Sequence, residues 1–215
     1  MLPHRLRAEL PHEGAGGGVV GDIEFHLAIQ AEICYDIWEN KKAERKFSMD
    51  YYECDNFMDL FFQMELRDEG AVIMQYYGEQ RKVFLPDLYK GIPITAIGNS
   101  AFLNCRALEI IRLPSELKCF YPMAFGDCTA LEKVMIPVSV ASIADRAFGW
   151  CTALKSVWGT GIRYVGEKAF WNCDALEEAI FAKDVVLDRF SGIQYMEMEG
   201  EISGESMWFR KQQKS

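Results

Sequence analysis

A repeat of about 23 residues constrains this chain more than any other feature. The dipeptide Ala-Phe recurs at 101–102, 124–125, 147–148 and 169–170, in steps of 23, 23 and 22 residues. A cysteine follows each of these phenylalanines by three residues (Cys105, Cys128, Cys151, Cys173), and a leucine follows each cysteine by three more (Leu108, Leu131, Leu154, Leu176). Two apolar columns precede each dipeptide: Ile94, Leu117, Val140, Ile162 and Ile97, Phe120, Ile143, Val165. Four clear copies at 92–183 therefore predict a solenoid of stacked repeats.

Within one copy, the pattern predicts a short strand and a short helical turn. Leu108, Ile111 and Leu113 alternate at their end like residues on one side of a strand, and Pro114 ends it because proline cannot donate to a strand ladder. The stretch Asn99–Cys105 is interpreted as a short helical turn. Stacked copies would repeat at about 4.8 Å per rung. Each buried Leu, Ile or Phe would then contribute about 1.5–3 kcal/mol.

The copy Ile94-Thr-Ala-Ile-Gly-Asn-Ser-Ala-Phe-Leu-Asn-Cys-Arg-Ala-Leu-Glu-Ile-Ile-Arg-Leu-Pro114 resembles the BspA-like (Treponema-type) leucine-rich repeat along its whole length. The resemblance implies an α/β fold, a leucine-rich-repeat solenoid of parallel short strands and short helical turns. It also implies a surface adhesin or an interaction protein, without catalytic residues in the repeats. Copies three and four depart from the unit at their ends, as expected where a stack is capped.

The flanking segments lack the repeat. Residues 1–20 contain several Gly and two Pro and are predicted to be a disordered tail. Residues 21–70 are predicted to be a helical N-terminal segment that caps the first rung, with helices from Asp22 to about Lys46 and near Asp55–Arg67; the alternative is a separate partner-binding module. A β-hairpin over Ala71–Leu85, turning near Gly78, would lead into the solenoid at 71–190. Val185–Phe190 is interpreted as a fifth, degenerate rung, and 191–215 as an irregular C-terminal segment.

Charge and hydropathy exclude some partners. The chain carries a net charge of −9, concentrated in residues 1–70, where 15 acidic side chains face 7 basic ones. Because an acidic chain repels phosphate and no Lys/Arg stripe is present, nucleic acid is not expected as a partner. No apolar run approaches the ~20 residues of a transmembrane helix, so no membrane insertion is expected. The chain as written has no signal peptide and predicts a cytoplasmic location; an incomplete N-terminus would move the expectation to the cell surface.

The residues give no pattern of a catalytic or metal site. Four of the seven cysteines belong to the repeat, and we interpret them as buried reduced thiols that pack as small hydrophobic groups. Zinc would require paired Cys or His at short spacing, which the chain lacks. The three histidines, His4, His12 and His26, lie outside the repeats. We therefore expect no cofactor, no metal and no enzymatic activity.

One column of outward-facing strand residues is the candidate binding site. It contains Arg112, Met135, Trp158 and Ile180, and the neighbouring column contributes Lys133. Exposed apolar stripes tend to mark contacts, and Met and Trp are favoured at interfaces. The stripe covers only about 300 Å², against roughly 800 Å² per partner in a standard interface.

The sequence thus predicts a non-catalytic protein–protein interaction module that presents a parallel-sheet face to a protein partner. The alternatives are an adhesin that binds a host or matrix protein and a carbohydrate-binding module that uses Trp158 and Trp171. A terminal segment of the same chain could also cover the stripe, and the ends of the solenoid could self-associate.

Overall fold

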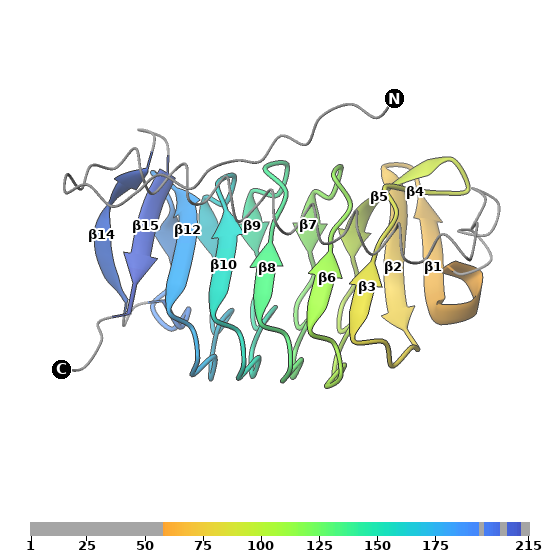
Figure 1. Ribbon diagram of the computed structural model, residues 1–215. Helices are drawn as coiled ribbons and strands as arrows, with labels where there is room; N and C mark the ends of the chain where they lie inside the picture. Colours follow the sequence, from red (N-terminus) through yellow and green to blue (C-terminus); the bar gives the residue numbers. More distant parts are fainter. Residues whose placement is uncertain (1–57, 194–195, 203–205, 212–215) are drawn as a thin grey trace, which may run out of the picture. The chain divides into compact units, whose positions relative to one another are not determined.

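The computed structural model describes residues 58–193, 196–202 and 206–211. These residues belong to the second of two compact units of the chain, Met49–Ser215. The tail predicted at 1–20 and the helix predicted from Asp22 to Lys46 lie outside the described residues. The described part contains fifteen strands, and its helical residues are confined to 58–61 (Figure 1).

The strands form three sheets. Sheet I has seven strands in the order β14-β15-β12-β10-β8-β6-β3. Sheet II has the order β1-β2-β5-β4 with β7 added on β5, and sheet III has the order β13-β11-β9. Strand β7 packs beside β9, so sheets II and III together form the second side of the solenoid. In Figure 1, β7 and β9 lie behind sheet I, and β1 and β2 stand at its right-hand end.

The bounds of the strands in sheet I, in chain order, are β3 (Lys82–Phe84), β6 (Ile110–Arg112), β8 (Lys133–Met135), β10 (Ser156–Gly159), β12 (Glu178–Ala182), β14 (Glu197–Ile202) and β15 (Ser206–Arg210). Those of the second side are β1 (Phe62–Arg67), β2 (Gly70–Tyr76), β4 (Leu88–Tyr89), β5 (Ile92–Ile97), β7 (Cys119–Phe120), β9 (Ser142–Ile143), β11 (Tyr164–Val165) and β13 (Val186–Leu187).

Each rung contributes one strand to sheet I, and the strands from successive repeats run parallel. Val134 pairs with Val157, and Val157 pairs with Ala179, so the central residue of each strand points into the core. The residues before and after it point outward, as the two-residue period of a strand requires. The sequence prediction of parallel strands in register with the repeat is confirmed.

The second side also pairs its parallel strands in register, although β7, β9, β11 and β13 have only two residues each. Ala96 pairs with Cys119, and Ser142 pairs with Tyr164. Val186 continues this column beyond the fourth copy by pairing with Tyr164. Val185–Phe190 is therefore a fifth rung, as the sequence predicted.

The segments that contain the Ala-Phe dipeptides form a third side, which we call the turn ridge (residues 98–106, 121–129, 144–152 and 166–174). The predicted helical turns here are wrong. The ridge is built of successive turns with hydrogen bonds such as Leu103 N–H to Ser100 O at 3.0 Å. Two residues of each rung have positive φ: Ser100 and Asn104, Met123 and Asp127, Arg146 and Trp150, Lys168 and Asn172.

This left-handed conformation explains why no helix forms. It turns the backbone amides toward the next rung instead of along the segment. Asn104 N–H donates to Gly126 O at 2.9 Å, and Phe102 N–H donates to Ala124 O at 2.8 Å. The ridge therefore satisfies its backbone groups between rungs, as a strand does, and the described part of the chain is a strand-and-turn solenoid rather than an α/β one.

A stack of phenylalanine rings forms the centre of the core. Neighbouring rings of Phe102, Phe125, Phe148 and Phe170 lie 4.9, 5.2 and 5.5 Å apart, centroid to centroid, and are nearly parallel. All four are buried. Phe120 adds edge-to-face contacts with Phe125 and Phe148. Because every repeat has Phe at the same position, the stack follows directly from the period of the sequence.

The cysteine column lies beside this stack. Cys128, Cys151 and Cys173 are buried, as predicted, and each thiol donates to the carbonyl of the phenylalanine one rung earlier, at 3.0–3.1 Å. Contact with Cys105 and Cys151, together with burial, raises the pKa of the Cys128 thiol. Burial raises the pKa of Cys173. The column is thus a set of small side chains that also cap backbone carbonyls.

We expect Cys151→Ala to lower the free energy of unfolding by about 1–2 kcal/mol, because it removes a buried sulfur and leaves the Phe125 carbonyl without this donor. Urea denaturation measures the change. Cys105→Ala is the matched control and should cost less, since Cys105 is only half-buried in the first copy. Equal losses at the two positions would contradict the assigned role.

The structure corrects the predicted N-terminal segment. Strand β1, not a helix, occupies Phe62–Arg67. It pairs with β2 in an antiparallel hairpin that turns at Asp68 and Glu69. The predicted hairpin over Ala71–Leu85 is also wrong, because β2 and β3 belong to different sheets.

The physical reason is the parallel pairing of β2 with β5, which makes β2 an additional rung. Gly70 starts this strand with a φ of +134°, and a Cβ there would lie 2.5 Å from the Thr95 side chain. Only glycine fits this close approach.

The C-terminal segment is not irregular in its described part. Strands β14 and β15 form an antiparallel hairpin, and β15 pairs antiparallel with β12. The hairpin therefore continues sheet I beyond the last parallel strand (Figure 1). Phe209 extends the aromatic core from Phe181, at 6.0 Å between centroids. No 23-residue period marks this segment, so the repeat could not reveal it.

Candidate protein-binding face

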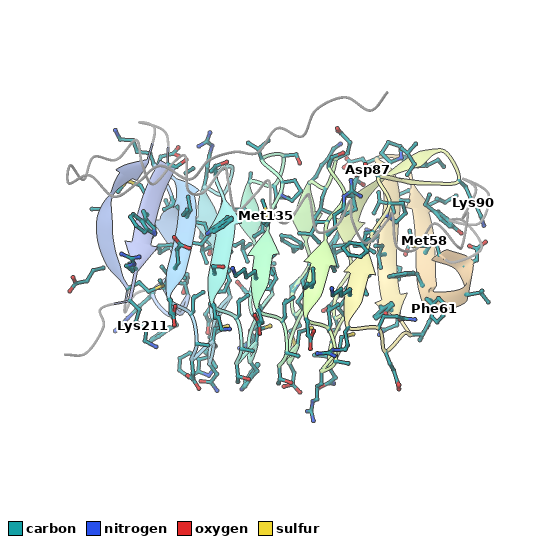
Figure 2. All side chains as sticks on the ribbon, in the orientation of Figure 1. Met58, Phe61, Asp87, Lys90, Met135 and Lys211 are labelled. Carbon is teal, nitrogen blue, oxygen red and sulfur yellow. The ribbon has the colours of Figure 1, made fainter. Side chains whose placement is uncertain are left out.

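The outward side of sheet I presents two columns of side chains. The first column contains the first residue of each parallel strand and the last residue of the antiparallel β15: Lys82, Ile110, Lys133, Ser156, Glu178 and Arg210, of which Ser156 is buried. The second column, two residues later on the parallel strands, contains Phe84, Arg112, Met135, Trp158, Ile180 and Trp208. All five residues predicted from the sequence therefore lie on one face. Figure 2 shows Met135 at the C-terminal end of β8, in the middle of this face.

Ile180 does not belong to the exposed part of the face. It is only 5% exposed, so the expectation that it contributes an exposed apolar surface is wrong. The register places it between Trp158 on β10 and Trp208 on β15. Two large indoles on the flanking strands leave little of a smaller side chain accessible. The sequence could not show this, because Trp208 lies outside the repeat.

Trp158 is half-buried and its indole is fixed by a hydrogen bond. Its Nε1–H donates to Oε2 of Glu178 on the next strand at 3.1 Å. Met135, also half-buried, pairs with it across β8 and β10. The two side chains thus form an ordered apolar surface, and a fixed indole loses little conformational freedom on binding.

Arg112 is exposed, but its guanidinium already forms a hydrogen bond and an ion pair within the chain. It donates to Leu85 O at 2.7 Å and forms an ion pair with Asp87 at 3.0 Å. Partial burial acts to raise the pKa of Asp87, but the Ser115 N–H and the Arg112 guanidinium outweigh it, so this pKa lies below its ordinary value. Arg112 therefore fixes the first rungs to each other and offers a partner a largely neutralised charge.

Lys133 is the free cation of the predicted set. It is exposed, and within the described residues it forms no ion pair. Its neighbours in the first column are Ile110 and Ser156. The predicted site therefore contains one available positive charge beside the apolar pair Met135 and Trp158.

Three apolar residues of this face were missing from the predicted site. Ile110 is 39% exposed beside Lys133, and Phe84 is exposed on β3. Trp208 is half-buried on β15, with the Arg210 guanidinium 4.8 Å from its ring. Phe84 could have been found from the partial copy Val83-Phe84-Leu85, and Ile110 from its alignment with Lys133. Trp208 could be placed only by the pairing of β15 with β12.

The rim of the face, at the start of the strands, carries paired charges. Arg81 pairs with Glu109, and Lys155 pairs with Glu132 at 3.4 Å. Exposed pairs of this kind contribute about 0–1 kcal/mol each.

Among the described residues no group of three or more His, Cys, Asp or Glu is arranged to hold a metal ion. No helix in the described part is long and apolar enough to cross a membrane.

The fold and the repeat together define a leucine-rich-repeat solenoid. The family described as the BspA type leucine rich repeat region (6 copies) matches residues 82–189, which is half of the chain. The chain therefore belongs to the BspA-type leucine-rich repeat family. Repeat families of this fold are in general non-catalytic modules for protein interaction or surface adhesion.

One solved structure has a similar fold. A leucine-rich repeat protein from Bacteroides ovatus is 24% identical, with a TM-score of 0.50 over 59% of this chain, and the match covers 35% of that protein. A T. pallidum leucine-rich repeat protein is 26% identical, with a TM-score of 0.47 over 55% of this chain and 67% of its own length. The first likeness shows the fold alone. No curated protein matches the chain.

Proposed function

We propose that the solenoid is a non-catalytic interaction module that binds a partner protein through the two outward columns of sheet I. The observation that supports this is the ordered apolar pair Met135 and Trp158 beside the unpaired cation Lys133. Trp and Met are enriched at interfaces, and a central apolar anchor surrounded by charges is the common arrangement of a binding energy hot spot.

The face favours a partner of particular chemistry. Lys82 and Lys133 lie on either side of Ile110 in the first column, and neither forms an ion pair among the described residues. A complementary surface would place carboxylates opposite these lysines and an apolar side chain against Met135 and Trp158. The partner is therefore a protein with an acidic surface around an apolar anchor.

The size of the face implies a modest affinity. Six strands at about 4.8 Å, each with two outward residues, give about 400 Å². This is half of the roughly 800 Å² that each partner contributes to a standard interface. Tight binding would need contacts beyond the two columns.

Charge reversal at Lys133 tests the proposed face. A partner protein would first be isolated by affinity capture on the wild-type chain. We expect Lys133→Glu to weaken binding of that protein by up to about ten-fold, mainly by slowing association, with a smaller effect at high salt. Surface plasmon resonance at two salt concentrations measures both quantities. Lys118→Glu, at an exposed lysine next to β7 on the second side, is the matched control. Equal effects of the two variants would show that the partner responds to net charge and not to sheet I.

A further inference from the structure

Two tryptophans lie on neighbouring rungs of the turn ridge, away from the two columns of sheet I. The backbone N–H of Trp150 donates to the Trp171 carbonyl at 2.7 Å, so the residues are in direct contact through the backbone. Trp150 is 37% exposed and Trp171 is half-buried. The proposed function uses neither of them.

Trp150 has a backbone conformation that residues with bulky side chains seldom adopt. Its φ is 62°, in the left-handed region, and the aligned residues of the other rungs are Asn104, Asp127 and Asn172. Asn and Asp tolerate this conformation, whereas a bulky residue there is unusual. The first left-handed position of each rung shows no such preference, since it holds Ser100, Met123, Arg146 and Lys168. An exposed, conformationally costly tryptophan therefore replaces a residue type that would fit the fold better, and such outliers gather at functional sites.

The charged residues of the turn ridge nearly balance, since it contains three basic and four acidic residues, and two of each form ion pairs within it. The Lys168 ammonium lies 5.9 Å from the Trp171 ring and pairs with Glu167 at 3.0 Å. Asp127, one rung before Trp150, pairs with Arg106. Asn172, which follows Trp171, and Thr152, two residues after Trp150, are exposed and neutral. These two adjacent rungs thus carry two indole-bearing residues, an exposed amide and an exposed hydroxyl, with little net charge to attract an ionic ligand.

A polypeptide ligand fits this surface poorly. Strand addition needs free backbone groups, but the ridge amides already donate between rungs, as Phe148 N–H does to Ala169 O at 2.8 Å. Two indoles also offer far less than the roughly 800 Å² of a standard protein interface. A sugar ring has an apolar C–H face the size of an indole and a rim of hydroxyls, which matches both the area and the chemistry of the patch.

We propose that Trp150 and Trp171 form a binding site for a neutral oligosaccharide. Its rings lie on the two indoles, and its hydroxyls form hydrogen bonds with the Asn172 amide and the Thr152 hydroxyl. This site is separate from the protein-binding face of sheet I, and each can be removed without the other.

Isothermal titration calorimetry of the full chain with hexasaccharides of glucose, N-acetylglucosamine and mannose tests the proposal. Wild type should bind at least one of these probes. Trp150→Asn restores the residue type of the aligned positions, so it should weaken binding at least ten-fold while the melting temperature rises by about 2–4 °C. Trp171→Ala should also weaken binding at least ten-fold. Trp158→Ala, on sheet I, should bind the sugar like wild type.

Four results would overturn the proposal. They are the absence of binding to all three hexasaccharides, unchanged binding by both Trp150→Asn and Trp171→Ala, equal loss in Trp158→Ala, and binding only to anionic probes such as heparin hexasaccharide or an acidic peptide library. Because protein capture through sheet I depends on Trp158 and Lys133, failure of the sugar site leaves the proposed function intact.

Discussion

Phe148→Ala is expected to lower the free energy of unfolding by about 3–5 kcal/mol, the largest effect of any single substitution considered for this chain. The ring is fully buried and stacks on Phe125 at 5.2 Å and on Phe170 at 5.5 Å, so its removal leaves a cavity between two rungs. In a solenoid each rung is stabilised only by its neighbours, so the loss weakens both interfaces of the third copy. Domains of this size are stable by about 5–15 kcal/mol. The variant should therefore lose a large fraction of the free energy of unfolding, which chemical denaturation followed by circular dichroism would measure.

Two controls separate the ring stack from a general sensitivity of the fold. Phe148→Leu keeps most of the buried apolar volume and should cost clearly less than the alanine variant. Val138→Ala, at an exposed loop position, should change stability by less than about 0.5 kcal/mol. A loss below 1 kcal/mol for Phe148→Ala would contradict the view that stacked phenylalanines carry the interfaces between rungs.

Trp158→Ala is expected to weaken binding of the partner protein by about 2 kcal/mol or more, which is roughly 30-fold. The indole lies at the centre of the second column, is fixed by its hydrogen bond to Glu178, and packs beside Met135. Truncation removes the largest apolar contact and leaves the Glu178 carboxylate without this donor. Calorimetry or surface plasmon resonance with the purified partner would give the change in affinity.

The matched control is Tyr164→Ala, because Tyr164 is an exposed aromatic residue on β11, on the second side. It should leave partner affinity unchanged. Both variants must keep the circular dichroism spectrum and cooperative unfolding of wild type. A partner that binds Trp158→Ala as tightly as wild type would remove sheet I as the binding face.

The corrections at the two ends of the solenoid share one cause, which is that strand pairing with the end of the stack overrides the local sequence pattern. Phe57, Leu60, Phe61 and Met64 have the spacing of an amphipathic helix, yet Phe62–Arg67 is a strand because β2 docks on β5 and recruits β1. Strand pairing also determines the structure of the C-terminal segment, where β15 pairs with the edge of β12. The sequence of one segment does not show which sheet edge will be available for that segment to pair with.

The positions of the residues on the binding face could be predicted from the sequence, but their contacts could not. The repeat period placed Arg112, Lys133, Met135 and Trp158 on one side of one sheet without any structure. It could not show that Arg112 is occupied by Asp87, because Asp87 lies in the irregular first rung. Nor could it show that Trp208 joins the second column and covers Ile180.

The sequence by itself determined the period and register of the repeats, the phenylalanine and cysteine columns, and which strand residues face outward. It could do so because stacked copies place equivalent residues in equivalent surroundings. The tertiary structure alone decided the conformation of the turn ridge, the hairpins at both ends and the exposure of the candidate site. These depend on hydrogen bonds between rungs and between distant segments, and the pattern of any single segment does not contain them.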